Sequence, residues 1–259
     1  MTAMLKSTSE GSTMVLTLSN PGLSNALSPE IYAAGIEALN AADSNPEIRS
    51  VIITGEGSSF CAGGDLRRLQ ALRSQDPQTQ GQAVDGLHNW IDSIRTFPKP
   101  VIAAVEGAAA GAGFSLALAA DFIVAADTAF FLMAYSNVGL SPDGGGSWAL
   151  ARALPHPLVA RTLMLGERLS AAQLQTWGLV NQVTPQGHAM TAALQLAQML
   201  NERAPNVLSS IKELMNEAPD ASLVQQLDSE RGHFVRNLRH SNSGEGIEAF
   251  LEKRLPRFS

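Results

Sequence analysis

Two short segments of the sequence place very small residues where a strand-like pattern gives way to a helix-like one. They are Ala62-Gly63-Gly64 and Gly111-Ala112-Gly113. Small residues let another group approach the backbone closely, and the first amides of a helix lack a partner within it and lie at its positive dipole end. Two such turns that converge would each aim one amide at the negative charge that develops on a carbonyl oxygen, an arrangement called an oxyanion hole.

A phosphate site is a weaker interpretation of the second turn. The nucleotide-binding pattern Gly-x-Gly-x-x-Gly does not fit, because Gly111-Ala112-Gly113 is followed by Phe114, Ser115 and Leu116. No well-placed acidic residue for a ribose follows either. The remaining alternative is structural, since glycine-rich turns also occur where a helix only needs to pack closely.

The elements that would position these turns alternate between strand and helix. Strand-like runs lie at residues 13–18, 49–55, 101–105, 122–125 and 129–133. Helical signals lie between them, at residues 29–44, 84–97 and 147–153. The polar segment 73–83 predicts a mobile surface connection, and helical periodicity dominates beyond Ser170. This alternation predicts an α/β fold of parallel strands covered by helices, with a helical appendage at the C-terminal end.

Composition limits the classes of function. The chain has 259 residues, of which 45% are hydrophobic, and a formal net charge of -6. This acidic balance disfavours nucleic acid as a partner. The single cysteine, Cys61, excludes an intramolecular disulfide, and no apolar stretch reaches the roughly 20 residues of a membrane helix. We therefore expect a soluble, cytoplasmic protein that binds neither nucleic acid nor membranes.

Four motifs, in this order and spacing, carry a resemblance to a known family. They are Ser24-Asn25-Ala26-Leu27, Phe60 to Leu66, Lys99 to Gly107 with the small-residue turn after it, and Gly139 to Gly146. Their succession resembles the crotonase (enoyl-CoA hydratase/isomerase) superfamily, and the resemblance covers essentially the whole chain.

The resemblance implies both an architecture and a substrate. A ββα spiral core is expected over residues 1–195, and a C-terminal helical trimerisation region over residues 196–259. The implied substrate is an acyl-CoA thioester whose oxygen lies between the backbone amides of Gly64 and Ala112, with no cofactor beyond the CoA moiety. The implied assembly is a homotrimer or a dimer of trimers.

The sequence departs from the hydratases of this family at the acid/base positions. Two glutamates that the resemblance leads us to expect are replaced by Ser115 and Tyr135, and neither is a carboxylate base. We interpret Ser115 as a helix residue that hydrogen-bonds its own backbone. Water addition by two glutamates is therefore not expected.

Asp143 is the candidate proton-transferring group. It lies between Pro142 and three glycines, where an aspartate could also serve as a helix N-cap. The segment Met133 to Asp143 is especially similar to the ring-isomerising and dehydroacyl-isomerising branch met in phenylacetate degradation, whose matching aspartate shuttles a proton. The resemblance thus implies a double-bond shift or ring isomerisation in an enoyl-CoA, which needs no metal or redox cofactor.

Three alternatives remain open at this point. One is an enoyl-CoA hydratase in the broad sense. Another is a hydrolase similar to 4-chlorobenzoyl-CoA dehalogenase, with Asp143 as nucleophile and His88 matching a histidine of that branch, although Tyr135 stands where that branch has tryptophan. The third is a non-catalytic acyl-CoA-binding protein.

The remaining candidates would bind substrate. Large side chains expected in the acyl pocket are His88, Trp90, Phe131, Met133, Tyr135 and Trp148. Further substrate-binding candidates are Ala26, Ala62, Arg67, Arg68 and Lys253, of which the last three could meet the CoA phosphates. Arg67 and Arg68 are equally well explained as a solvated helix face, and Lys253 could reach the site from a neighbouring subunit. No metal site is expected, because the other histidines lack metal-ligand spacing.

Overall fold

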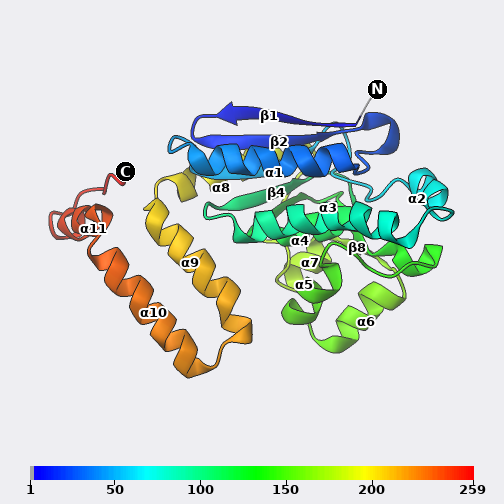
Figure 1. Ribbon diagram of the computed structural model, residues 1–259. Helices are drawn as coiled ribbons and strands as arrows, with labels where there is room; N and C mark the ends of the chain where they lie inside the picture. The colour runs from blue at the N-terminus through cyan, green and yellow to red at the C-terminus, as the bar shows by residue number, and fades with distance from the viewer. Residues whose placement is uncertain (1–2) are drawn as a thin grey trace.

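Two sheets form the centre of the molecule (Figure 1). The computed structural model describes residues 3–259. The strands are Met4–Glu10 (β1), Thr13–Ser19 (β2), Ser50–Gly55 (β3), Val101–Val105 (β4), Ala108–Ala110 (β5), Phe122–Ala126 (β6), Phe130–Leu132 (β7), Arg168–Ser170 (β8) and Gln182–Thr184 (β9). The larger sheet has the order β1-β2-β3-β4-β6-β9, with β1 antiparallel to β2 and all other pairs parallel. The smaller sheet has the order β5-β7-β8.

Helices alternate with the strands and then continue alone after β9. The α-helices are Pro29–Ser44 (α1), Leu66–Leu72 (α2), Pro77–Thr96 (α3), Ala112–Ala119 (α4), Gly146–Ala153 (α5), His156–Met164 (α6), Ala171–Thr176 (α7), Ala189–Asn201 (α8), Pro205–Glu217 (α9), Leu223–Leu238 (α10) and Ser241–Leu251 (α11). Short 3-10 helices are Pro21–Leu23 (η1), Ala134–Val138 (η2) and Ala218–Asp220 (η3). The predicted α/β class with a helical C-terminal region is confirmed.

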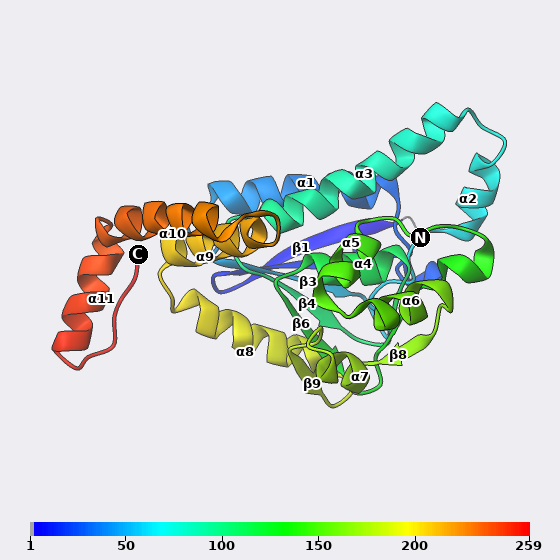
Figure 2. The ribbon, with the colours of Figure 1, turned by 90° about the horizontal axis from the view of Figure 1, so that it is seen from below.

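The central strands β3, β4 and β6 of the larger sheet are covered on both faces, which explains their nearly uninterrupted apolar sequences. The edge strand β1 is polar and mostly exposed. Side chains alternate between the two faces along each strand. Ile52, Ile102 and Ala104 pack with α8 in one buried cluster, whereas Val51 and Ile53 belong to the larger core with residues of α1 and α3. Figure 2 shows α1 and α3 on one side of the sheet and α8 on the other.

The prediction of a mobile connection over residues 73–83 is wrong in its second half. Helix α3 begins at Pro77, seven residues before the predicted start near residue 84. The Asp76 carboxylate accepts a hydrogen bond from the Gln78 amide at 3.3 Å, and Pro77 occupies the first helical position. This cap starts the helix although its first turns are polar.

The expected boundary between residues 195 and 196 falls inside α8. Ala192, Ala193 and Ala197 of this helix are buried against the larger sheet, on both sides of that boundary. Because one helix covers one sheet face continuously, all of α8 belongs to the core. The C-terminal helical region therefore begins with α9.

Helices α9 to α11 extend away from the two sheets (Figures 1 and 2). The Lys212 ammonium of α9 anchors them, since it donates to Asp121 at 2.8 Å and to the Ile94 carbonyl at 3.1 Å. Burial lowers the pKa of Lys212 and raises the pKa of Asp121. A buried charge that keeps its partner avoids the large cost of an uncompensated one, so this pair fixes where α9 leaves the core.

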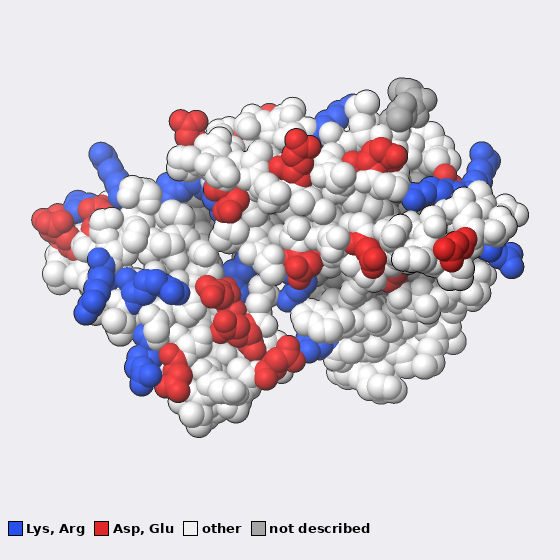
Figure 3. All heavy atoms as spheres, in the orientation of Figure 1, with Lys and Arg blue, Asp and Glu red and all other residues white. Residues whose placement is uncertain are grey.

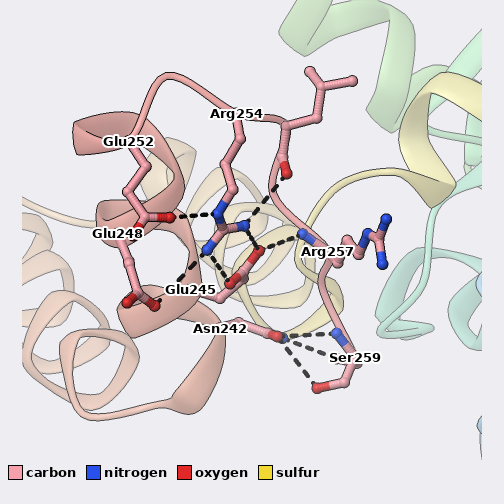
Figure 4. Close-up of polar contacts among 8 residues, drawn as sticks. Asn242, Glu245, Glu248, Glu252, Arg254, Arg257 and Ser259 are labelled. Carbon is pink, nitrogen blue, oxygen red and sulfur yellow. Dashed lines mark hydrogen bonds and ion pairs between the residues drawn. The ribbon is translucent and has the colours of Figure 1, made fainter.

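The C-terminal tail folds back onto α11 (Figure 4). The Arg254 guanidinium contacts the carboxylates of Glu245 at 2.6 Å and Glu252 at 2.7 Å, and its hydrogen bonds lower the pKa of Glu245 to about 2. Asn242 exchanges hydrogen bonds with the backbone of Ser259 at 2.9 and 3.0 Å. The tail is thereby held against the helix that precedes it.

Charged side chains of both signs are interspersed on the face shown in Figure 3. Basic side chains gather at the end formed by α2, the helix that carries Arg67 and Arg68. Among residues 3–259, no helix is long and apolar enough to pass through a membrane.

Two helical glycines allow a test of the packing between α1 and α3. A Cβ atom at Gly35 would lie 2.2 Å from Nε1 of the fully buried Trp90, whereas a Cβ atom at Gly81 would meet nothing within 4 Å. Gly35→Ala should lower the free energy of unfolding by about 1–2 kcal/mol, because overpacking outweighs the gain in helix propensity. Gly81→Ala should raise it by up to about 1 kcal/mol. Urea unfolding of both variants measures these changes. Equal changes in the free energy of unfolding would contradict the close contact between Gly35 and Trp90.

Candidate active site

The two small-residue turns lie side by side. The Cys61 amide donates to the Ala108 carbonyl and the Ala110 amide donates to the Cys61 carbonyl, each at 2.9 Å. These bonds pair Cys61 with Ala109 in a parallel bridge. The structure therefore brings together two turns that are separated by more than forty residues of sequence.

Glycine is required where the turns meet. Gly63 has a φ of +89°, and a Cβ atom there would lie 2.6 Å from the Ala110 carbonyl oxygen. A Cβ atom at Gly113 would lie 2.3 Å from the Cys61 carbonyl oxygen. Real Cβ atoms do not approach backbone atoms so closely, so these two glycines permit the contact.

The Gly64 and Ala112 amides belong to these turns. Ala112 is the first residue of α4, and its amide nitrogen would lie 3.3 Å from a Cβ atom on Gly63, the residue before Gly64. Within the described part of the chain, neither the Gly64 nor the Ala112 amide donates a hydrogen bond. The Ala112 amide also lies at the positive dipole end of α4, so both amides are free to bind an oxyanion.

The Ser24-to-Leu27 motif packs against the first turn, Ala62-Gly63-Gly64, and hydrogen-bonds the backbone near it. Asn25 is buried with a left-handed φ of 58°, and its side chain donates to the carbonyls of Glu56 at 2.9 Å and Ser59 at 2.7 Å. The Leu27 amide donates to the Gly63 carbonyl at 2.8 Å. Asn25 was not among the predicted site residues, although it lies in the motif that carried the resemblance.

Asp143 is held by the two residues that stand at the expected glutamate positions. The Tyr135 hydroxyl donates to Oδ1 of Asp143 at 2.5 Å. The Ser115 hydroxyl donates to the backbone carbonyl of Asp143 at 3.0 Å. The interpretation that Ser115 bonds its own helix is wrong, because the Asp143 loop passes directly over this position of α4.

The helix-cap alternative for Asp143 is also excluded. The residue at the cap position of α5 is Gly145, and no side chain caps this helix. Asp143 is half-buried, two residues before that cap. Its carboxylate is thus directed to Tyr135 and is not used to start the helix.

Both tyrosines of the chain lie near this carboxylate. Burial, together with the Asp143 charge and hydrogen bond, raises the pKa of Tyr135 far above its ordinary value. Burial, with a smaller contribution from Asp143, raises the pKa of Tyr32 to about 12. Both phenols therefore stay protonated at neutral pH. Tyr32 was not predicted, since an isolated tyrosine on an amphipathic helix carries no sequence signal for a site.

The other walls around Asp143 are apolar. A Cβ atom at Gly144 would lie 3.3 Å from Leu87, and one at Gly145 would lie 3.8 Å from Ile91, so these residues place α3 beside the loop. Met133 is buried next to Gly146, where a Cβ atom would lie 2.7 Å from its methyl group. Met133 and Tyr135 are the predicted acyl-pocket residues that the structure places at Asp143.

The other four predicted pocket residues differ in their burial and contacts. Trp90 is fully buried between α3 and α1, with its ring centroid 6.3 Å from that of Tyr32. Phe131 is fully buried against Phe114, with centroids 5.0 Å apart. His88 is on an exposed side of α3, and Trp148 lies on the surface of α5.

Trp148 takes part in a different interaction. Its ring lies between two guanidinium groups, with Arg95 4.4 Å and Arg152 4.1 Å from the ring centroid. Arg152 also pairs with Asp220 of η3 at 2.7 Å. Trp148 thus joins α3 to α5, and Arg152 links α5 to η3, so these contacts of Trp148 are structural.

The other substrate-binding candidates fall into two groups. Ala26 is buried and Ala62 is exposed at the first turn, whereas Arg67 and Arg68 follow that turn on α2. Lys253 has a left-handed φ of 59° directly after α11, at the opposite end of the molecule from α2 (Figures 1 and 2). Lys253 therefore does not reach this site within its own chain.

The remaining histidines do not form a metal site. His233 is buried beside Arg236, and His240 caps α11 through Nδ1, which accepts from the Asn242 amide at 3.1 Å. Over residues 3–259, no three His, Cys, Asp or Glu side chains are grouped so that they could hold a metal ion. His156 and His188 are both exposed.

Comparison with known proteins agrees with this architecture. Residues 8–259 match the family model described as enoyl-CoA hydratase/isomerase. The 1,2-epoxyphenylacetyl-CoA isomerase of Escherichia coli (strain K12) is 38% identical over 251 residues, which cover 96% of each chain. The carnitinyl-CoA dehydratase of Salmonella typhi is 36% identical over 261 residues, which cover 99% of this chain and 98% of the relative.

A solved structure extends the comparison to three dimensions. The crystal structure of an enoyl-CoA hydratase from Polaromonas sp. JS666 matches with a TM-score of 0.98 and 68% sequence identity, over 99% of this chain and 100% of that chain. The fold is therefore the crotonase fold that the four motifs led us to expect. On the family model and these relatives together, the chain belongs to the enoyl-CoA hydratase/isomerase (crotonase) family.

Proposed function

We propose that this enzyme shifts a double bond, or isomerises a ring, in an enoyl-CoA thioester, with Asp143 as the proton shuttle. One observation carries the proposal. Ser115 and Tyr135 stand where two glutamates were expected, and both donate hydrogen bonds to Asp143. Of these three side chains only Asp143 is a carboxylate, whereas adding water by the two-glutamate route needs two carboxylates.

The proposed reaction balances with one base. Asp143 takes a proton from C2 of a 3-enoyl-CoA, and the electron pair of that C–H bond forms an enolate whose charge rests on the thioester oxygen. The same carboxyl group returns the proton to C4, the carbonyl reforms, and the double bond now joins C2 and C3. No atom is gained or lost, so no cofactor beyond the CoA moiety of the substrate is required.

The two free amides supply the second part of the mechanism. In the proposed complex the Gly64 and Ala112 amides donate to the thioester oxygen, where the enolate charge develops. The dipole of α4 favours the same charge. Tyr135 lies against Gly111, at 3.6 Å from the position of a Cβ atom there, so the amide site and Asp143 are next to each other.

The relatives include both an isomerase and a dehydratase, so their names are consistent with isomerisation but also with dehydration. The Escherichia coli relative is an isomerase of 1,2-epoxyphenylacetyl-CoA, and the Salmonella typhi relative is a dehydratase of carnitinyl-CoA. The replaced glutamates favour isomerisation over dehydration. A dehalogenase-like hydrolysis is disfavoured by Tyr135, which stands where that branch has tryptophan.

Replacing the carboxylate tests the proposal. Asp143→Asn should lower kcat about 10²–10⁴-fold, because the amide cannot accept the substrate proton, while the Kd for a CoA ester changes little. Asp76→Asn is the matched control, since asparagine also caps α3 and turnover should stay at the wild-type level. The assay follows 3-enoyl-CoA by absorbance and mass. Unchanged turnover in Asp143→Asn, or a product heavier by one water, would refute the proposal.

The contact between the two turns generates a second test. Gly63→Ala would press its Cβ atom against Ala110 and displace the Gly64 or Ala112 amide, so we expect a loss of about 10²–10³ in kcat. Gly57→Ala is the control, because Gly57 also has a positive φ, +77°, but nothing within 4 Å of a Cβ atom. Equal kcat values for the two variants would argue against the oxyanion site.

We also propose that the chain assembles as a homotrimer or a dimer of trimers through α9 to α11. Exposed apolar side chains are concentrated there, and they are Ile211, Met215, Leu223, Val224, Leu227, Phe234, Val235, Leu238, Ile247, Phe250 and Leu251. A cavity of about 450 Å³ between α9 and α10 adds apolar surface that a neighbouring copy could fill. Lys253 would then approach the CoA site of a neighbouring subunit.

Light scattering tests this assembly. Phe250, 82% exposed on α11, is the site for a disruptive charge, and Phe250→Asp should dissociate the oligomer. Met164→Asp is the control, because Met164 is 73% exposed on α6, away from the C-terminal helices. A wild-type protein that elutes as a monomer would rule the assembly out.

A further inference from the structure

Tyr135 contacts both parts of the candidate site. Its hydroxyl donates to Oδ1 of Asp143 at 2.5 Å. Its ring lies beside Gly111, where a Cβ atom would be 3.6 Å from both Cζ and the hydroxyl oxygen. Gly111 directly precedes Ala112, so one side chain spans from the acid/base group to the proposed amide site.

Contacts other than the Tyr135 hydroxyl also hold the backbone around Asp143 in place. Ser115 holds the Asp143 carbonyl at 3.0 Å, and Gly144 and Gly145 adopt positive φ values of 59° and 74°. A Cβ atom at Gly144 would lie 3.0 Å from Cβ of Ser115, so the loop is pressed onto α4. These backbone contacts do not fix the rotation of the Asp143 carboxylate, which the Tyr135 hydroxyl bonds at Oδ1.

The hydrogen bond from Tyr135 makes the two carboxylate oxygens of Asp143 inequivalent. Tyr135 occupies Oδ1, and within residues 3–259 Oδ2 accepts no hydrogen bond. The phenol itself is a poor base or acid, because burial and the Asp143 charge raise its pKa well beyond the ordinary value. Tyr135 therefore acts as a fixed donor, and Oδ2 is the oxygen left to exchange a proton.

We propose that Tyr135 is a positioning residue for the isomerisation, which holds Oδ1 of Asp143 so that Oδ2 alone takes and returns the substrate proton. This inference rests on the proposed function. It assigns to Tyr135 a role that acts through Asp143, in place of the acyl contact expected from its residue type.

No other group in the described chain duplicates this donor. Tyr32 and Arg68 contribute charge or polarity in the neighbourhood, but neither hydrogen-bonds Asp143. From α3 the loop meets the apolar Leu87 and Ile91. Removal of the Tyr135 hydroxyl would thus leave the carboxylate free to rotate.

A double-mutant cycle tests the inference with the isomerisation assay. Tyr135→Phe should lower kcat roughly 10- to 100-fold, as for loss of a hydrogen bond to a charged group, with KM within about threefold of wild type. In an Asp143→Asn background the same change should cost almost nothing further, because the hydroxyl acts through the carboxylate. If the Tyr135 hydroxyl had only a structural role, Tyr135→Phe would lower kcat by the same factor in the wild-type and Asp143→Asn backgrounds. That result would overturn the inference.

A spectroscopic measurement keeps the test independent of residual activity. The chain has only two tyrosines, so 3-fluorotyrosine incorporated into a Tyr32→Phe variant labels Tyr135 alone. Its fluorine resonance should move when Asp143→Asn is added, and stay unchanged when Asp76→Asn is added. An unmoved resonance in both would refute the contact. Wild-type turnover in Asp143→Asn would instead refute the proposed function, so the two failures are distinguishable.

Discussion

The site depends on direct contact between two stretches of backbone with no side chain between them. Cys61 pairs with Ala109, and Gly63 and Gly113 fit against backbone carbonyls of the opposite turn. Hydrogen-bonded backbone is stiff, so amides held in this way need little reorganisation when charge develops nearby. The sheets, the Asn25 contacts and the start of α4 all serve to bring these two stretches together.

The residue at position 115 links the chemistry to the packing. Cβ atoms at Gly144 and Gly146 would lie 3.0 Å from Ser115 Cβ and 2.6 Å from Ser115 Oγ, respectively. A glutamate at this position would occupy the volume through which the Asp143 loop passes. The small serine and the glycines thus form one matched set, which replaces a carboxylate on α4 with a carboxylate on the loop above it.

Features that depend on local sequence patterns, such as strands and turns, could be predicted from the sequence. The location of a residue type that occurs in several kinds of environment could not. Apolar runs located the parallel strands, and the two turns were identified because glycine and alanine at a strand-to-helix junction have a physical meaning. Trp90 and Trp148 were misplaced, since an aromatic side chain looks the same in a core, at a guanidinium pair or in a pocket. The Tyr135–Asp143 bond was not foreseen, because it depends on the path of a loop.

Helix α8 has a consequence for the order in which the chain can fold. It packs on β2, β3, β4, β6 and β9 on one face of the larger sheet, yet it follows all the strands of that sheet in sequence. On the ribosome, Ile52 and Ile102 are synthesised long before the residues that shield them. Non-local contacts of this kind make folding slow and leave apolar surface open in the meantime. Until α8 has emerged, one face of the central strands therefore stays apolar and uncovered.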